Sequence, residues 1–234
     1  MLAGSTALVT GASRGIGRAI AVALASRGAD LVVTSRRGPD LEEVARATAG
    51  RAIAADLVRS GEVERLIERV RTRLGGAPTV LVNAAGRFQL VLAARLEPEE
   101  LERHLAVNLR APILLARAFL PEMLSRGRGH LVHIGSVAGR WPFRENAAYA
   151  ASKYGLRGFH EVLRLELEGT GVRTSLIEPG PVDTPAWDAV AERLGADLPS
   201  RSRMLRPERV AEAVITCLAL GREGAEADLR LVPE

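Results

Sequence analysis

Short apolar runs alternate with longer amphipathic segments along almost the whole chain. Short runs rich in Val, Leu, Ile and Ala are typical of buried strands, whereas apolar residues spaced three and four apart are typical of helices. The pattern predicts strands at residues 6–10, 31–34, 51–55, 79–82, 131–134, 172–177 and 228–232. It predicts helices at residues 15–27, 39–49, 61–74, 98–126, 149–168 and 207–220. Strands that alternate with helices in this way indicate parallel βαβ units.

The predicted strands are apolar on both faces, which indicates a sheet covered by helices on either side. No linker, repeat or shift of composition divides the 234 residues. We therefore predict an α/β fold, with one doubly wound domain over residues 1–234 and about seven parallel strands. Pro112 and Pro121 fall inside the long helix at 98–126, and we expect them to bend it, because proline lacks the N–H of a helical hydrogen bond.

The composition is typical of a globular protein, with 47% hydrophobic and 26% charged residues. No apolar run is long enough for a membrane span, and the first residues lack the pattern of a signal peptide. With Cys217 as the single cysteine, these features favour a cytoplasmic protein without disulfides. The net charge of +4 comes from arginines interspersed with acids, which argues against nucleic acid as a partner. The four histidines lack metal-ligand spacing, and we predict no metal site.

Tyr149 and Lys153 are the first candidates for chemistry. They lie four residues apart in a predicted helix and therefore on one face of it. Because a nearby ammonium favours a phenolate, we expect Lys153 to lower the pKa of Tyr149. A phenol tuned in this way can exchange a proton with a substrate oxygen near neutral pH. Lys153 is the only lysine among 32 basic residues, which indicates that this position needs a compact, rotatable cation.

A glycine-rich turn joins the first predicted strand to the first helix. Its sequence is Thr10-Gly11-Ala12-Ser13-Arg14-Gly15-Ile16-Gly17. Glycines permit a tight turn and a close approach of the backbone to a pyrophosphate, which then faces the helix N-terminus. A turn at this place in an α/β chain is a much more specific signal than the glycines alone. It predicts a dinucleotide site, with a purely structural turn as the alternative.

Further motifs follow the turn in a fixed order. The glycines are spaced G-x-x-x-G-x-G, and Asn83-Ala84-Ala85-Gly86 comes after the fourth strand. Asn108, Ser136 and the Tyr149–Lys153 pair come next. As a set, these motifs resemble the short-chain dehydrogenase/reductase family, in its compact single-domain branch, which includes 3-oxoacyl reductases. The resemblance spans about residues 6–184 and implies a single NAD(P)-binding, Rossmann-type catalytic domain.

The resemblance also implies roles for individual residues. The catalytic set would be Asn108, Ser136, Tyr149 and Lys153, with Tyr149 as general acid in carbonyl reduction and as base in alcohol oxidation. Lys153 would lower the pKa of Tyr149 and bind the nicotinamide ribose. Ser136 would polarise the substrate oxygen, and Asn108 would hold a water that links Lys153 to solvent. The implied cofactor contacts are Gly11, Ser13, Arg14, Gly15, Ile16, Gly17, Arg36, Arg37, Asp56, Leu57, Asn83, Ala84, Ala85, Gly86, Tyr149, Lys153, Pro179, Gly180, Val182 and Thr184.

The end of the second strand bears on the choice of nucleotide. A carboxylate there would bind the free ribose hydroxyl of NAD, but the position holds Ser35. Arg36, Arg37 or Arg14 could meet a 2′-phosphate instead, because guanidinium matches phosphate geometry. We therefore predict NADP (NADPH) as the cofactor. Asp56, after the third strand, would either contact the adenine, as the resemblance implies, or cap a turn.

Aromatic residues are few and fall near the expected cleft. Phe88, Trp141, Phe143, Tyr149 and Trp187 lie in loops or helix starts, which favours an apolar or mixed carbonyl or alcohol substrate, such as a 3-oxoacyl thioester or an apolar ketone. The alternative is that these residues only close loops over the core.

The chain departs from the family pattern at Ala84 and in its last residues, which lack the Asp-Gly-Gly ending of many 3-oxoacyl reductases. Both departures weaken the inference that this chain shares the substrate and the tetramer contacts of those reductases. The long helices still suggest a homodimer or homotetramer.

Three other functions share some of these motifs. A non-catalytic NADP-binding sensor or regulator would be expected to lack one of the four catalytic residues, and all four are present. A sugar-nucleotide epimerase or dehydratase shares the Tyr–Lys pair, but the glycine spacing and the lack of a large C-terminal domain argue against it. An NAD-dependent alcohol dehydrogenase is the third alternative.

Overall fold

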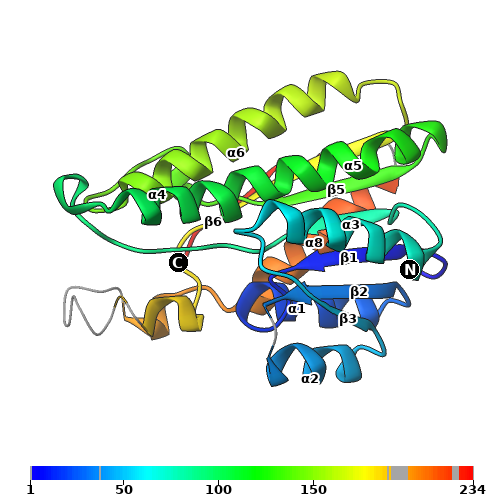
Figure 1. The fold of residues 1–234 in the computed structure, drawn as a ribbon, viewed down its shortest axis with the longest axis horizontal. Helices are drawn as coiled ribbons and strands as arrows, with labels where there is room; N and C mark the ends of the chain where they lie inside the picture. The colour runs from blue at the N-terminus through cyan, green and yellow to red at the C-terminus, as the bar shows by residue number, and fades with distance from the viewer. Residues whose placement is uncertain (1, 37, 189, 191–199, 223–226, 234) are drawn as a thin grey trace.

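The centre of the protein is a parallel sheet (Figure 1). The computed structural model describes residues 2–36, 38–188, 190, 200–222 and 227–233. Within these residues, seven parallel strands are ordered β3-β2-β1-β4-β5-β6-β7. The strands are β1 (Thr6–Thr10), β2 (Asp30–Ser35), β3 (Arg51–Ala54), β4 (Val80–Asn83), β5 (Gly129–Ile134), β6 (Val172–Pro179) and β7 (Leu229–Leu231). The helices are α1 (Gly15–Ala25), α2 (Pro39–Ala47), α3 (Ser60–Leu74), α4 (Pro98–Leu105), α5 (Ala111–Ser125), α6 (Ala147–Glu166) and α8 (Pro207–Arg222).

Helices cover both faces of the sheet because its strands are apolar on both faces. In β1, Ala7 and Val9 pack into a core with α1, α2 and α8. Leu8, which points the other way, packs into a second core with α3, α5 and α6. All three side chains are fully buried. The predicted doubly wound α/β fold, with about seven parallel strands, is therefore confirmed.

The long helix predicted at 98–126 is interrupted, but not in the manner expected. A π-helical turn, Ala106–Arg110, separates α4 from α5, and the N–H of Ala111 bonds to the carbonyl of Ala106, five residues earlier. Pro112 follows at once and has no N–H for the carbonyl of Asn108, four residues before it. The irregularity therefore lies just before Pro112, whereas Pro121 is accommodated inside α5.

The order of the strands creates a crevice at the carboxyl edge of the sheet. β1 and β4 are neighbours, but the chain continues from β1 to β2 on one side and from β4 to β5 on the other. Ligands of open α/β sheets bind at such a switch point, beyond the carboxyl ends of the strands. Gly11 and Ala84 are the first residues after these two strands, so the glycine turn and the Asn83–Gly86 motif meet there.

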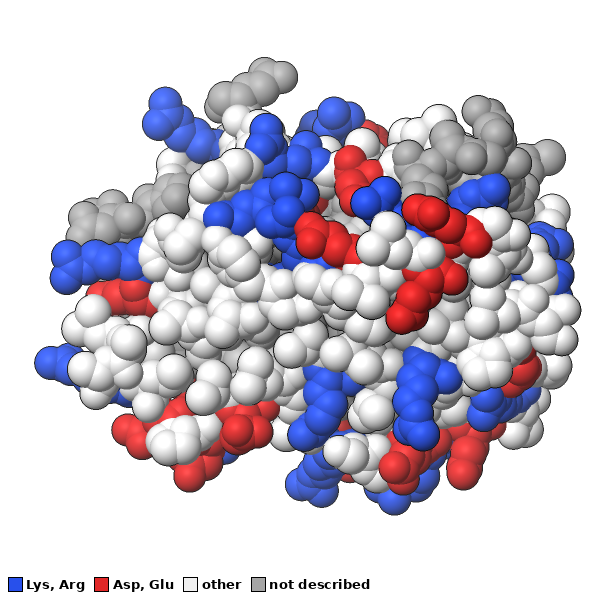
Figure 2. All heavy atoms as spheres, turned by 90° about the horizontal axis from the view of Figure 1, so that it is seen from above, with Lys and Arg blue, Asp and Glu red and all other residues white. Residues whose placement is uncertain are grey.

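One face of α6 presents apolar side chains to the exterior. Tyr154, Val162 and Leu165 are 40%, 55% and 62% exposed, and their spacing places them on one side of the helix. Figure 2, which views the molecule from the side where α6 lies, shows a broad band of uncharged surface with charged side chains along its margins. An uncharged surface that includes exposed apolar side chains is typical of a surface that binds another protein chain.

Candidate active site

The glycine turn after β1 is packed too tightly to admit side chains. Gly11 has a φ of 66°, and a Cβ there would lie 2.6 Å from the Cα of Ala85. A Cβ on Gly17 would lie 2.3 Å from the carbonyl oxygen of Gly11. The Thr10 hydroxyl accepts the N–H groups of Ala84 and Ala85, both at 3.0 Å. The structure therefore brings the two predicted cofactor motifs into direct contact.

The N-terminus of α1 is open to an anion. Arg14, at the N-cap, gives no side-chain cap, and no acidic residue lies in the first turn. The first N–H groups of a helix have no partner within it, and they favour negative charge. Gly15 has a φ of 55°, and a Cβ on it would come within 3.0 Å of the Thr184 side chain. The segment after β6 therefore reaches the same crevice through Thr184, and the site fits a dinucleotide pyrophosphate.

Ser136, Tyr149 and Lys153 converge at this edge of the sheet. Ser136 follows β5, and its hydroxyl accepts the N–H of Ala138 at 3.1 Å. Tyr149 and Lys153 lie in the first two turns of α6. The Lys153 ammonium lies 5.7 Å from the centre of the Tyr149 ring and donates to the carbonyl of Ile134 at 2.7 Å. Lys153 is only 4% exposed, whereas Tyr149 is partly exposed.

The pKa of Tyr149 is raised, which corrects the expectation from the sequence. Burial disfavours the phenolate and has the larger effect, while hydrogen bonding with Ser136 acts in the opposite direction. The Lys153 ammonium lies 5.7 Å from the centre of the Tyr149 ring and donates to the carbonyl of Ile134. Burial lowers the pKa of Lys153 itself to about 8. Tyr149 is therefore a neutral phenol near pH 7, the form that a general acid requires.

Asn108 lies in the π-helical turn and is fully buried. Its side chain accepts the backbone N–H of Arg87 at 2.8 Å and donates to the carbonyl of Arg87 at 2.9 Å. It also donates to the hydroxyl of Ser152 at 2.9 Å. The amide thus joins the loop after Gly86 to α6. The backbone carbonyl of Asn108 lacks the helical donor that position 112 would normally supply, because Pro112 has no N–H, and the water that would link Lys153 to solvent stays a prediction.

The residues predicted to bind the adenosine part of the cofactor differ in their exposure and in their contacts. Arg14 and Arg36 are exposed, and neither forms an ion pair with any described residue. Arg37 lies outside the described residues. Asp56 accepts the N–H of Val58 at 3.1 Å, so it caps a turn, which was one of its two predicted roles. Leu57 is 6% exposed and packs in the core.

Aromatic rings wall the outer side of Tyr149. Phe88 packs edge-on against Tyr149, with ring centres 4.9 Å apart, and against Trp187 at 5.0 Å. The Trp187 indole donates to the carbonyl of Val182 at 3.0 Å. Trp141 and Phe143 are 53% and 46% exposed and lie outside this stack. Three of the five predicted aromatic residues, Phe88, Tyr149 and Trp187, therefore pack together.

Two residues of the site were missed by the sequence analysis. Thr10 ties β1 to the start of the Asn83–Gly86 loop, and Ser152 connects Asn108 to the backbone of Tyr149 at 2.7 Å. Ser152 precedes Lys153 and is three residues from Tyr149, a helical spacing that could have marked it. Thr10 gives no such signal, because it reads as the last residue of a strand.

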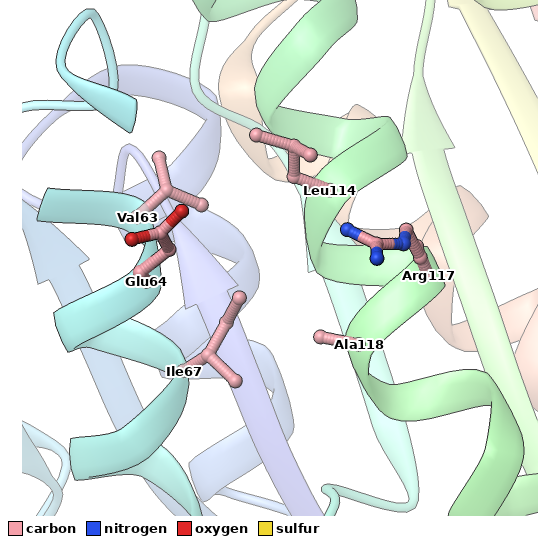
Figure 3. A pocket seen from close by; sticks show the side chains of 6 residues that line it. All are labelled: Val63, Glu64, Ile67, Leu114, Arg117 and Ala118. Carbon is pink, nitrogen blue, oxygen red and sulfur yellow. The ribbon is translucent and has the colours of Figure 1, made fainter. Parts of the chain in front are cut away.

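A separate groove of about 270 Å³ lies between α3 and α5 (Figure 3). Glu64 and Arg117 stand on opposite walls of it. None of its lining residues belongs to the predicted catalytic or cofactor sets, so it is distinct from the crevice. No helix in the described part of the chain is long and apolar enough to cross a membrane. The described residues contain no group of three or more His, Cys, Asp or Glu side chains suited to a metal ion.

Comparison with known proteins gives consistent results. The sequence model of the family described as short chain dehydrogenase matches residues 5–195. A short chain dehydrogenase of Pseudocercospora fijiensis is 41% identical over 191 residues, which span 78% of this chain and 61% of that protein. The chain also spans 19% of the longer glycine betaine reductase ATRR of Emericella nidulans, with 33% identity.

Solved structures extend the likeness over the whole chain. A metagenomic short-chain oxidoreductase in complex with NADP has a TM-score of 0.83 and 35% identity, covering 100% of this chain and 98% of that one. A 3-oxoacyl (acyl-carrier-protein) reductase of Agrobacterium tumefaciens with NADP bound has a TM-score of 0.87 and 30% identity, covering 99% and 94%.

Proposed function

The chain belongs to the short-chain dehydrogenase family, and we propose on that premise that it transfers hydride reversibly between NADPH and a carbonyl or secondary alcohol. The observation that carries the proposal is the position of the Tyr149 hydroxyl. It lies beside Lys153 and Ser136, at the carboxyl edge of the sheet and next to a glycine turn that fits a pyrophosphate. A proton donor and a dinucleotide site are thereby brought to the same crevice.

The side chains present can carry out the proton transfers of this reaction. NADPH, when bound, supplies the hydride. Tyr149 gives its hydroxyl proton to the substrate oxygen, which Ser136 holds by a hydrogen bond. Lys153, with a pKa of about 8, returns a proton readily to the phenolate, because the pKa of Tyr149 is above its ordinary value of 10.0. The carbonyl of Asn108 offers a place for water on the far side of Lys153.

The nucleotide is proposed to be NADP because Ser35 replaces an acid and Arg14 and Arg36 are free to meet a phosphate. We expect Ser35→Asp to reduce kcat/KM for NADPH relative to NADH by about 100-fold, or about 2.7 kcal/mol. The new carboxylate would bind a ribose hydroxyl and repel a 2′-phosphate. Initial rates with both coenzymes measure the ratio. The exposed Ser26, at the other end of α1, provides a matched Ser→Asp control, and an unchanged ratio in the Ser35 variant would contradict the assignment to NADP.

The substrate is proposed to be an apolar carbonyl compound, such as a 3-oxoacyl thioester or an apolar ketone, because an aromatic wall flanks Tyr149. Trp187→Ala should raise the KM for such a substrate by about 5-fold, since burying a large apolar side chain is worth 1.5–3 kcal/mol and only part of that contact is lost. The KM for NADPH should change less. Phe143→Ala serves as the control, because Phe143 is 46% exposed. If Trp187→Ala leaves the substrate KM unchanged, Trp187 is not part of the pocket.

We further propose that two copies of the chain associate through the exposed apolar face of α6. Tyr154, Val162 and Leu165 would be shielded from water in a homodimer or homotetramer. Light scattering of the purified protein measures the mass, and Leu165→Glu should shift it toward the monomer.

The function is tested by following the absorbance of NADPH with a set of carbonyl compounds. An acetoacetyl thioester, small diketones and aromatic aldehydes cover the proposed classes. Oxidation with the thioester dominant would assign the protein to acyl-chain chemistry, and oxidation only with the others would assign a general carbonyl reductase. Tight NADPH binding without turnover of any carbonyl or of the matching alcohols would favour the sensor alternative.

A further inference from the structure

Residues 136–141, called the serine loop below, lie in the connection between β5 and the catalytic helix α6. The first half of the loop is fixed by a backbone bond to β6 just before it and by a side-chain cap. The N–H of Gly135 bonds to the carbonyl of Ile177 at 2.7 Å, and Ser136 caps the 3-10 turn Val137–Gly139. Its second half continues this turn, because the N–H groups of Arg140 and Trp141 bond to the carbonyl of Val137 at 3.0 and 2.9 Å, and it is held by side chains as well.

Arg140 joins the serine loop to β6 through an ion pair. Its Nε donates to Oε2 of Glu178 at 2.5 Å, and the Glu178 side chain is only 4% exposed. The other carboxylate oxygen, Oε1, has no hydrogen-bond partner among the described residues. A buried carboxylate with one charged partner depends strongly on it. Loss of Arg140 would therefore free the loop and also remove the one ion pair that Glu178 forms with a described residue.

Trp141 makes a second contact, on the next strand. The Arg230 guanidinium lies 4.9 Å from the centre of the Trp141 ring, a cation–π distance. Arg230 on β7 is the register partner of Glu178 on β6, and paired residues of parallel strands project to the same face. Consecutive residues of the serine loop thus dock on consecutive strands of the sheet.

The serine loop is also fixed to α6. The Tyr154 hydroxyl donates to the carbonyl of Arg140. A Cβ on Gly139 would lie 3.1 Å from the carbonyl of Lys153, so the loop packs directly against the backbone of the catalytic helix. Arg140 is therefore the point at which α6, β6 and the serine loop meet.

We propose that Arg140 and Glu178 are positioning residues: their ion pair holds the serine loop so that Ser136 and Tyr149 meet the substrate oxygen together. The proposal rests on the proposed function, since Ser136 must first act on a substrate. Neither residue needs to touch substrate or cofactor, because the effect passes through Ser136.

A double-variant cycle tests whether Arg140 acts through Ser136. In the otherwise native protein, Arg140→Met and Glu178→Gln should each lower kcat by about 10- to 100-fold, the cost of a misplaced catalytic group. NADPH affinity should change less than about twofold, because the glycine turn is untouched. In a Ser136→Ala background, Arg140→Met should have almost no further effect on kcat. Equal losses in both backgrounds would overturn the proposal.

Conservative and control variants exclude a general loss of structure. Arg140→Lys keeps the charge and should restore kcat to within about threefold of native. Arg157→Met removes an ion pair to Glu161 on the same helix α6, 2.8 Å long, and should leave kcat unchanged. If Arg140→Met does not fold, Glu178→Gln, which preserves side-chain volume, completes the cycle with Ser136→Ala.

Amide hydrogen exchange separates this proposal from the proposed function. It needs no substrate, and we expect exchange at residues 137–141 to rise at least about tenfold in Arg140→Met and Glu178→Gln, but not in Arg157→Met. If exchange rises and kcat of the native protein is zero with every carbonyl, the proposed function fails while the loop is still held as inferred. If exchange does not rise, the ion pair does not hold the loop and the inference is wrong, whatever the activity.

Discussion

The Tyr149→Phe variant should bind NADPH normally and lose about 10³-fold in kcat, because general acid catalysis contributes about 10²- to 10⁴-fold. The substitution removes one oxygen and keeps the ring, which packs against Phe88 with ring centres 4.9 Å apart. The aromatic wall and the fold should therefore persist. Turnover is measured by NADPH absorbance with the best carbonyl substrate, and binding by the fluorescence of the nucleotide.

The second tyrosine of the chain provides the comparison for this variant. Tyr154 lies on the next turn of α6, and its hydroxyl donates to the carbonyl of Arg140 rather than facing the crevice. Tyr154→Phe should therefore cost much less in kcat than Tyr149→Phe. A Tyr149→Phe protein with full turnover would exclude Tyr149 as the acid and with it the proposed mechanism.

The Lys153→Met variant should lose activity to a similar degree but gain stability. Lys153 is 4% exposed, and burial lowers its pKa from an ordinary value of 10.5 to about 8. That difference corresponds to about 3 kcal/mol of unfavourable burial in the charged form. Methionine has similar length and no charge, although it gives up the hydrogen bond to Ile134. We expect the cofactor-free variant to be about 1–3 kcal/mol more stable to denaturant at pH 7.

The pH dependence of this difference has a definite sign. Below pH 8, Lys153 is charged in both the folded and the unfolded chain, and the cost of burial is fully present. Between about pH 8 and 10.5 the folded chain has lost the proton and the unfolded chain retains it, so the stability of the native protein should rise toward that of the variant. Denaturant titrations of both proteins across this range measure the difference. A variant that is less stable at pH 7, or a difference that does not shrink, would contradict the burial argument.

The fold could be predicted largely from the sequence because its signals are local and repeated. Apolar strands bounded by turns, such as residues 172–177 within β6, mark a sheet covered on both faces. The position of a glycine turn between β1 and α1 identifies the edge where ligands bind. The spacing of Tyr149 and Lys153 needs only the helical period to bring them together. The roles given to Asn108, Ser136, Tyr149 and Lys153 remain predictions.

Other features depend on contacts that no local pattern encodes. The raised pKa of Tyr149 follows from desolvation in the folded chain, and the sequence shows only that a cation is near. Arg140 and Glu178 are 38 residues apart, and nothing in either segment identifies the partner. The π-helical turn around Asn108 arises from a proline that was expected only to bend a helix.

The place of β7 has a consequence for the order in which the protein gains its structure. β7 is parallel to β6, and Asp228, just before it, accepts the N–H of Leu176, 52 residues earlier in the chain. Its Leu231 carbonyl also accepts the N–H of Gly180 at 2.7 Å, within the segment after β6. Pairings between distant parts of a chain form slowly, and this one also completes a wall of the crevice. During refolding, the helical content should therefore return before the capacity to bind nucleotide, and the interval between them reports the docking of the last strand.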